Sequence, residues 1–150
     1  MADAAQLIAI VVAVLSGLAA VVGIVIYTRA LDTHRFWPLM RAAQFAAIGQ
    51  AVFAGVAAAL GHRPNSSLYW LYAALPVAVS LIAEQLRIGS AQSVLDAHEL
   101  PDAQAVGKLD EAGQRAIVYE ILRRELGVMT AAAVVICFLA LRAAGTSAGL

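Results

Sequence analysis

Glu84 is the residue in this sequence whose type and position best suit chemistry, because it is a carboxylate near the end of a long apolar run at 67–86. An ionisable side chain inside a membrane span costs about 2.5–3.5 kcal/mol at mid-membrane and less near the edge. Such a group is therefore a candidate for proton or cation handling. The alternative is a structural ion pair at the membrane boundary. Four arginines lie at the expected level of such a pair: Arg41, Arg87, Arg123 and Arg124.

Two further polar residues within the apolar runs are candidates for the same site. Gln50 lies near the middle of the run at 42–62, where an unpaired amide is unfavourable. We expect it to join two helices through a hydrogen bond worth about 0.6 kcal/mol, or alternatively to line a ligand pocket. Ser80 lies one helical turn before Glu84 and on the same helical face. Glu84, Gln50, Ser80 and Arg87 thus form the candidate polar site, with a role in transport or in packing.

Groupings typical of enzymes, metal sites and cofactor sites are missing from the sequence. It holds no nucleophile elbow, P-loop or glycine-rich dinucleotide fingerprint. Its single cysteine, Cys137, lies in an apolar run and forms no CxxC pair. His34 and His98 fall outside the apolar runs and His62 lies at the last position of the run 42–62, so no two of them can meet inside a membrane to hold haem. We therefore expect no enzymatic activity, no metal and no cofactor.

The composition is that of an integral membrane protein. Hydrophobic residues make up 62% of the chain and charged residues 13%, against about 25% charged in soluble domains. The mean hydropathy is +0.81. Ten basic and ten acidic residues cancel, so the charge balance gives no indication of a nucleic-acid partner.

Four apolar runs are long enough, or nearly long enough, to cross a bilayer. At about 1.5 Å per residue, about 20 residues cross a hydrocarbon core of about 30 Å. The predicted spans are 4–28, 42–62, 67–86 and 124–142. The flank Met1-Ala2-Asp3 has no basic residue, so we expect the first run to be a retained span and not a cleaved signal. The sequence predicts an all-α, single-domain bundle of four transmembrane helices over residues 1–150.

The basic residues predict the orientation. The connection 29–41 carries three basic residues and 87–124 carries five, whereas the opposite side has Arg63 and Arg142. Under the positive-inside rule both basic loops are cytoplasmic and both termini lie outside. Nine arginines against one lysine indicate a GC-rich genome. We expect the plasma (inner) membrane of a prokaryote.

The segment 87–125 is predicted to form a cytoplasmic helical hairpin between the third and fourth spans. A helical extension over 86–100 is followed by turn residues, and a second helix starts near Asp110. Two pairs with glutamate four residues before arginine are expected on it: Glu111 with Arg115, and Glu120 with Arg124. Three interpretations stay open. The segment could be a solvated hairpin, an interfacial amphipathic helix or a docking surface for a partner.

Each predicted span has one face of small residues, which is what helix packing in lipid requires. On the second span this face holds Ala43, Ala47, Gln50, Ala51, Ala54, Ala58 and Gly61. From these faces together with the projecting hairpin and the few polar residues within the spans, we expect a non-enzymatic accessory or structural subunit of a membrane complex, or a homo-oligomer. Its partners would be the lipid bilayer and other membrane proteins or its own copies. The alternative is a small transporter or channel that uses Glu84 and Gln50 in its path.

Overall fold

The computed structural model describes residues 1–30 and 32–150, and the regular elements in this range are all helices. They are α1 (Ala2–Arg29), the 3₁₀ helix η1 (Thr33–Arg35), α2 (Phe36–Ala59), α3 (Leu68–Ala97), α4 (Ala103–Val106) and α5 (Glu111–Thr146). Four helices are long and apolar enough to cross a membrane: α1, α2 with η1, α3 and α5. The predicted all-helical fold with four membrane-competent helices is therefore confirmed.

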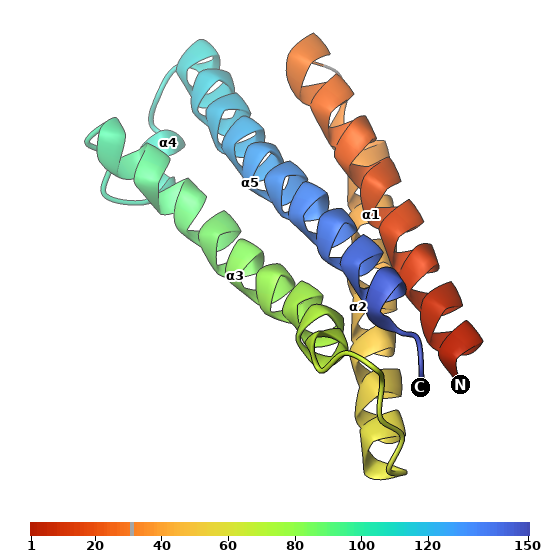
Figure 1. Cartoon of the computed structure of the whole chain (residues 1–150). Coiled ribbons are helices and arrows are strands. Elements are labelled where there is room, and N and C mark those ends of the chain that lie inside the picture. The colour runs from red at the N-terminus through yellow and green to blue at the C-terminus, as the bar shows by residue number, and fades with distance from the viewer. Residues whose placement is uncertain (31) are drawn as a thin grey trace.

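The long helices lie side by side, with α5 between α1 and α3 (Figure 1). The second helix, α2, packs against α1 and α3 and makes little contact with α5. Both termini lie at one end of the molecule, which we call the terminal end. There the Ala2 N–H donates to the Leu150 carbonyl at 3.1 Å, and the Asn65 N–H donates to the Ala148 carbonyl at 2.8 Å. The opposite end, with η1, α4 and the start of α5, is called the α4 end.

The bounds of α2 differ from the predicted span 42–62, because α2 begins at Phe36 and ends at Ala59. Pro38 permits the early start, since the first-turn N–H groups of a helix have no intrahelical partner and a proline there loses nothing. Gly61 causes the early end. It adopts a positive φ of 80°, and the His62 N–H donates to the Ala57 carbonyl at 3.0 Å. This pattern closes a helix C-terminus and favours glycine at the left-handed position.

Between α3 and α5 the chain turns at the α4 end. Side chains of two aspartates accept from backbone N–H groups at the starts of α4 and α5: Asp102 from Ala105 at 2.8 Å, and Asp110 from Gly113 at 3.0 Å. An apolar cluster of Val94, Leu95 and Ile117 joins the end of α3 to the start of α5. These contacts hold the ends of α3 and α5 together.

One of the two expected ion pairs on α5 forms. Glu111 pairs with Arg115. The expected pair of Glu120 with Arg124 is wrong, because the Glu120 carboxylate lies 2.9 Å from Nε2 of His98 instead. His98 directly follows the end of α3, so this contact joins the end of α3 to α5.

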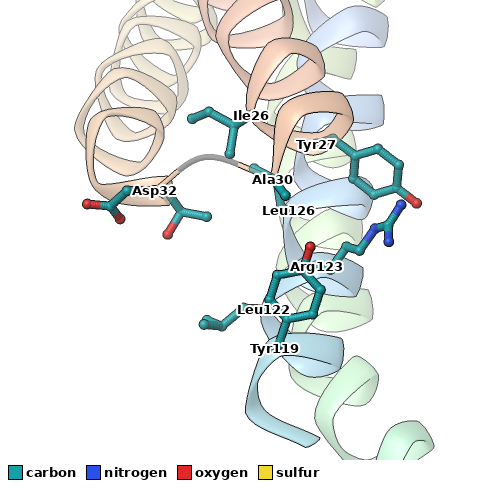
Figure 2. A pocket seen from close by; sticks show the side chains of 9 residues that line it. Ile26, Tyr27, Ala30, Asp32, Tyr119, Leu122, Arg123 and Leu126 are labelled. Carbon is teal, nitrogen blue, oxygen red and sulfur yellow. The ribbon is translucent and has the colours of Figure 1, made fainter. Parts of the chain in front are cut away.

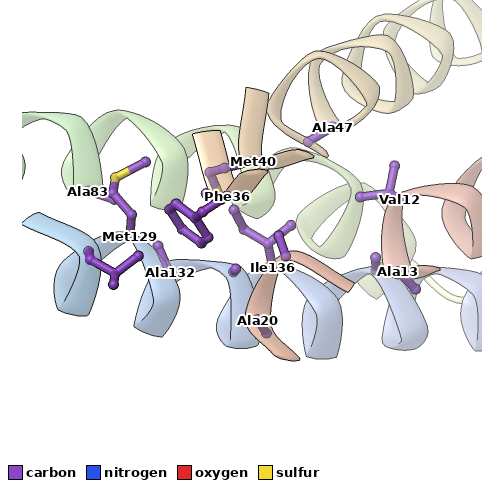
Figure 3. Close-up of a cluster of buried hydrophobic side chains, with 14 of the residues drawn as sticks. Val12, Ala13, Ala20, Phe36, Met40, Ala47, Ala83, Met129, Ala132 and Ile136 are labelled. Carbon is purple, nitrogen blue, oxygen red and sulfur yellow. The ribbon is translucent and has the colours of Figure 1, made fainter. Parts of the chain in front are cut away.

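Alanines and larger apolar side chains, among them Phe36, Met40 and Met129, together fill the space between the helices (Figure 3). The expected small faces are buried in part, and bulky side chains lie on the outer surfaces. Buried residues from those faces include Ala9, Ala13, Ser16 and Ala20 of α1, Ala43, Ala47 and Ala54 of α2, and Thr130, Ala133 and Ala140 of α5. Exposed bulky residues include Leu7, Phe45, Leu81 and Phe138. Because lipid supplies no hydrophobic drive between helices, the association of these helices depends on the close approach of their backbones.

The closest such approach involves Gly23 of α1. A Cβ atom at this position would lie 2.9 Å from Cε2 of Phe36 and would collide with the Thr130 hydroxyl of α5. The missing side chain therefore lets α1 pack directly on α5 and on the first turn of α2.

We predict that Gly23→Val destabilises the fold by about 2 kcal/mol, because overfilling a packed core costs about 1–3 kcal/mol. Gly49→Val is the matched control, since a Cβ at Gly49 meets nothing within 4 Å. Thermal unfolding of the purified protein in mild detergent, followed by circular dichroism, measures both variants. Equal midpoints for the two would contradict the proposed close approach.

Candidate functional site

Glu84 lies on α3 and accepts hydrogen bonds from three side chains. Its Oε1 accepts from Nη1 of Arg41 at 2.5 Å and from Nε2 of Gln44 at 3.0 Å. Its Oε2 accepts from Nε of Arg87 at 2.9 Å. Arg41 also donates to Oε1 of Gln44 at 2.8 Å, which closes a ring of contacts between α2 and α3. Both carboxylate oxygens are thus engaged.

Arg87 extends this ring to a third helix. Its Nη1 lies 3.7 Å from Oε2 of Glu125 on α5, and its guanidinium lies 5.3 Å from the ring centre of Trp37 on α2. A guanidinium over an indole ring gains electrostatic attraction. We call this set the Glu84 cluster: Trp37, Arg41, Gln44, Glu84, Arg87 and Glu125. It joins α2, α3 and α5.

The Glu84 cluster has no net formal charge, because two arginines face two glutamates. Its charged side chains are partly shielded, with Glu84 at 22% and Glu125 at 17% exposed. A lone carboxylate in a span is unfavourable, whereas paired and hydrogen-bonded charges offset much of their desolvation. The arrangement suits a clamp between helices, and it leaves no oxygen of Glu84 without a donor.

Ser80 lies beside the Glu84 cluster. A cavity of about 180 Å³ has Arg41, Gln44 and Glu84 at one side and Ser80 among its other lining residues. The Ser80 hydroxyl, however, donates to the Pro76 carbonyl of its own helix at 2.8 Å. Ser80 therefore serves the backbone of α3, and the cavity holds no activated nucleophile.

Gln50 is not part of the Glu84 cluster. It lies six residues beyond Gln44 on α2, which is about 9 Å along the helix axis. Its side chain is 1% exposed, and neither amide atom has a hydrogen-bond partner among residues 1–30 and 32–150. The expected interhelical hydrogen bond is thus absent from the described part of the chain. The structure brings Glu84, Arg87 and Ser80 together and leaves Gln50 apart.

Sequence reasoning missed Gln44, Glu125 and Trp37. A signal for Gln44 was present, because it follows Arg41 by three residues and so shares its helical face. Glu125 ends the charged segment before the last apolar run, at the level expected for Arg87. The ring of Trp37 gave no comparable signal, since its contact with Arg87 depends on how α2 and α3 cross.

The histidines lie at helix ends and not between the spans. His34 is in η1, His62 follows the end of α2, and His98 follows the end of α3. Within the described residues no three side chains of histidine, cysteine, aspartate or glutamate are grouped so that they could hold a metal ion.

Comparison of the chain with known proteins gives no relative. No protein-family model, curated protein or solved structure matches it. The function therefore has to be argued from the geometry.

We predict that Glu84→Gln destabilises the fold by about 1 kcal/mol, because it removes the charge shared by Arg41 and Arg87. This value lies between those of exposed and buried pairs. Glu111→Gln is the control and should cost about 0.3 kcal/mol, since Glu111 and Arg115 form an exposed pair on one helix. Unfolding midpoints in mild detergent compare the two. An unchanged midpoint in Glu84→Gln would show that the cluster does not clamp the helices.

Proposed function

We propose that this chain is a non-enzymatic helical subunit of a membrane, and that it binds other membrane proteins or further copies of itself. The observation that carries the proposal is that both carboxylate oxygens of Glu84 already accept hydrogen bonds, from Arg41, Gln44 and Arg87. A carboxylate that carries a proton or cation across a membrane needs a free oxygen and a path, and Gln50 lies apart from this site. The polar residues therefore favour packing over transport.

One face of α2 supports association with another helix. Ala51, Gly55 and Ala59 are spaced four residues apart, and Gly55 and Ala59 are exposed. A Cβ atom at Gly55 would meet nothing within 4 Å. Small residues at this spacing let two backbones approach closely in lipid. Because Gly55 and Ala59 are exposed, this side of α2 is open to a further helix.

We predict that the protein leaves the membrane in a stoichiometric complex and that Gly55→Leu weakens this complex about tenfold. Gly49→Leu is the matched control. It is also exposed on α2, but six residues away it points about 120° from Gly55. Native mass spectrometry after gentle solubilisation identifies and counts the attached chains.

Three outcomes of this experiment differ in meaning. A foreign partner identifies a complex, and a homo-oligomer identifies self-association. A wild-type protein that is monomeric in every mild detergent overturns the proposal and favours a small carrier. In that case Glu84→Gln should abolish flux without reducing the amount of protein in the membrane.

The proposed setting is a four-helix bundle in the plasma (inner) membrane of a prokaryote. In this setting the α4 end is a cytoplasmic hairpin and the termini lie outside. The distribution of basic residues supports it, since the two connections at the α4 end hold eight of them and the terminal end holds Arg63 and Arg142.

We predict that a cysteine at Ala148, in a Cys137→Ser background, reacts with an impermeant maleimide added to intact cells. Ala148 is exposed at the terminal end, so the thiol is accessible if that end is outside. A cysteine at Lys108 is the control and should react after permeabilisation. The reverse pattern would invert the proposed orientation.

A further inference from the structure

A groove runs between α1 and α5 near the α4 end. It has a volume of about 390 Å³ and is lined by Ile24, Tyr27, Thr28, Gly127, Thr130, Ala131 and Val134. Gly127 lies beside Tyr27 in this groove, where a Cβ would be in ordinary van der Waals contact with Cε2 of that ring at 3.5 Å. The lining is mostly apolar, and Ala131 and Val134 are exposed along it. The groove is therefore a mostly apolar depression in the outer surface of α1 and α5.

A second cavity adjoins this groove at Tyr27 and is more polar. It has a volume of about 260 Å³, and Tyr27, Asp32, Tyr119 and Arg123 are among its lining residues (Figure 2). Arg123 lies one turn before Gly127 on α5, about 6 Å further toward the α4 end. Along α5 the surface thus changes from apolar to cationic within one helical turn. Tyrosines are typical of the depth at which acyl chains meet headgroups.

Arg123 is available for an anion. Its guanidinium lies 4.7 Å from the ring centre of Tyr27, and it forms no ion pair with any described residue. Arg41, Arg87 and Arg115 differ, because each is paired with a glutamate. Asp32 accepts from the His34 N–H at 3.1 Å and lies on the other side of the cavity from Arg123 in Figure 2.

We propose that the groove and the adjoining cavity form a binding site for one anionic phospholipid. The acyl chain lies in the groove between α1 and α5, and the Arg123 guanidinium, held by the Tyr27 ring, binds the phosphate. The planar guanidinium matches phosphate oxygens in a two-pronged contact. Basic pockets between transmembrane helices are suited to anionic headgroups. The site is independent of the proposed association through α2.

The chemistry of the lining favours a lipid as the occupant. The walls of the groove are mostly apolar, which suits an acyl chain. They end at the adjoining cavity, where the Arg123 guanidinium suits the headgroup of the same molecule. The free positive charge of Arg123 favours an anionic headgroup over a zwitterionic one, because the ammonium of a zwitterionic lipid offsets the charge of its phosphate.

Native mass spectrometry of the full-length protein tests the site, with phosphatidylglycerol or phosphatidylcholine of the same acyl chains added to detergent. We expect the wild type to retain one molecule of phosphatidylglycerol and to prefer this lipid over phosphatidylcholine at least tenfold. Arg123→Gln should reduce phosphatidylglycerol retention about tenfold and phosphatidylcholine retention less, so that the preference for phosphatidylglycerol is lost. Ala131→Phe fills the groove and should reduce the retention of both lipids.

Arg142→Gln is the matched control, because Arg142 also lies over a tyrosine, 5.5 Å from the Tyr72 ring centre, but at the terminal end. It should retain phosphatidylglycerol like the wild type. An equal loss of phosphatidylglycerol retention in Arg142→Gln would overturn the proposed site, because it would show a nonspecific attraction of basic residues for the lipid. The absence of any preference for phosphatidylglycerol in the wild type would overturn it as well.

A second measurement separates binding from folding. Phosphatidylglycerol should raise the unfolding midpoint of the wild type and of Arg142→Gln, but not that of Arg123→Gln. Arg123→Lys keeps the charge and loses the planar contact, so it should retain an intermediate preference. Full retention of the wild-type preference and midpoint shift in Arg123→Gln would overturn the proposal.

Discussion

The close approach of α1 to α5 at Gly23 is the constraint on which the rest of the arrangement depends. Lipid is as apolar as the helices, so packing there is driven by contact and not by the exclusion of water. A glycine opposite the Thr130 side chain gives that contact without a gap, and the Phe36 ring packs onto the same point. This places the start of α2 against α1. It also fixes α5 in the position from which it reaches α3.

The Glu84 cluster is the polar counterpart of this apolar contact. It lies toward the α4 end and joins α2, α3 and α5. The contact between α2 and α3, which it strengthens, is less extensive than the contacts of α5 with α1 and with α3. A hydrogen-bonded ring has one geometry, whereas small apolar faces tolerate sliding. Arg41, Gln44 and Arg87 therefore set the register of α2 against α3. The same contacts occupy both carboxylate oxygens of Glu84, the residue whose type and position best suit transport.

The sequence was sufficient to predict the four helices, because hydropathy and helical spacing are local properties of the chain. It also indicated four arginines at the level of Glu84 as partners. Arg41 and Arg87 pair with it, whereas Arg123 and Arg124 do not. The isolation of Gln50 could not be predicted, because a hydrogen bond between helices depends on their crossing angle and rotation. The same holds for Glu120, whose partner His98 is close in space but distant in sequence. The ends of α2 depended on the local chemistry of Pro38 and Gly61, which hydropathy does not measure.

The place of α5 between α1 and α3 has a consequence for biosynthesis. A ribosome makes α1 first and α5 after α2 and α3, yet α1 finds its most extensive neighbour in α5. While the later segments are being made, the surface of α1 around Gly23 and Ala13 faces the bilayer or the insertion machinery. Assembly is completed when the fourth span enters the membrane. A chain that stops before α5 thus leaves the surface of α1 around Gly23 without the helix that packs against it.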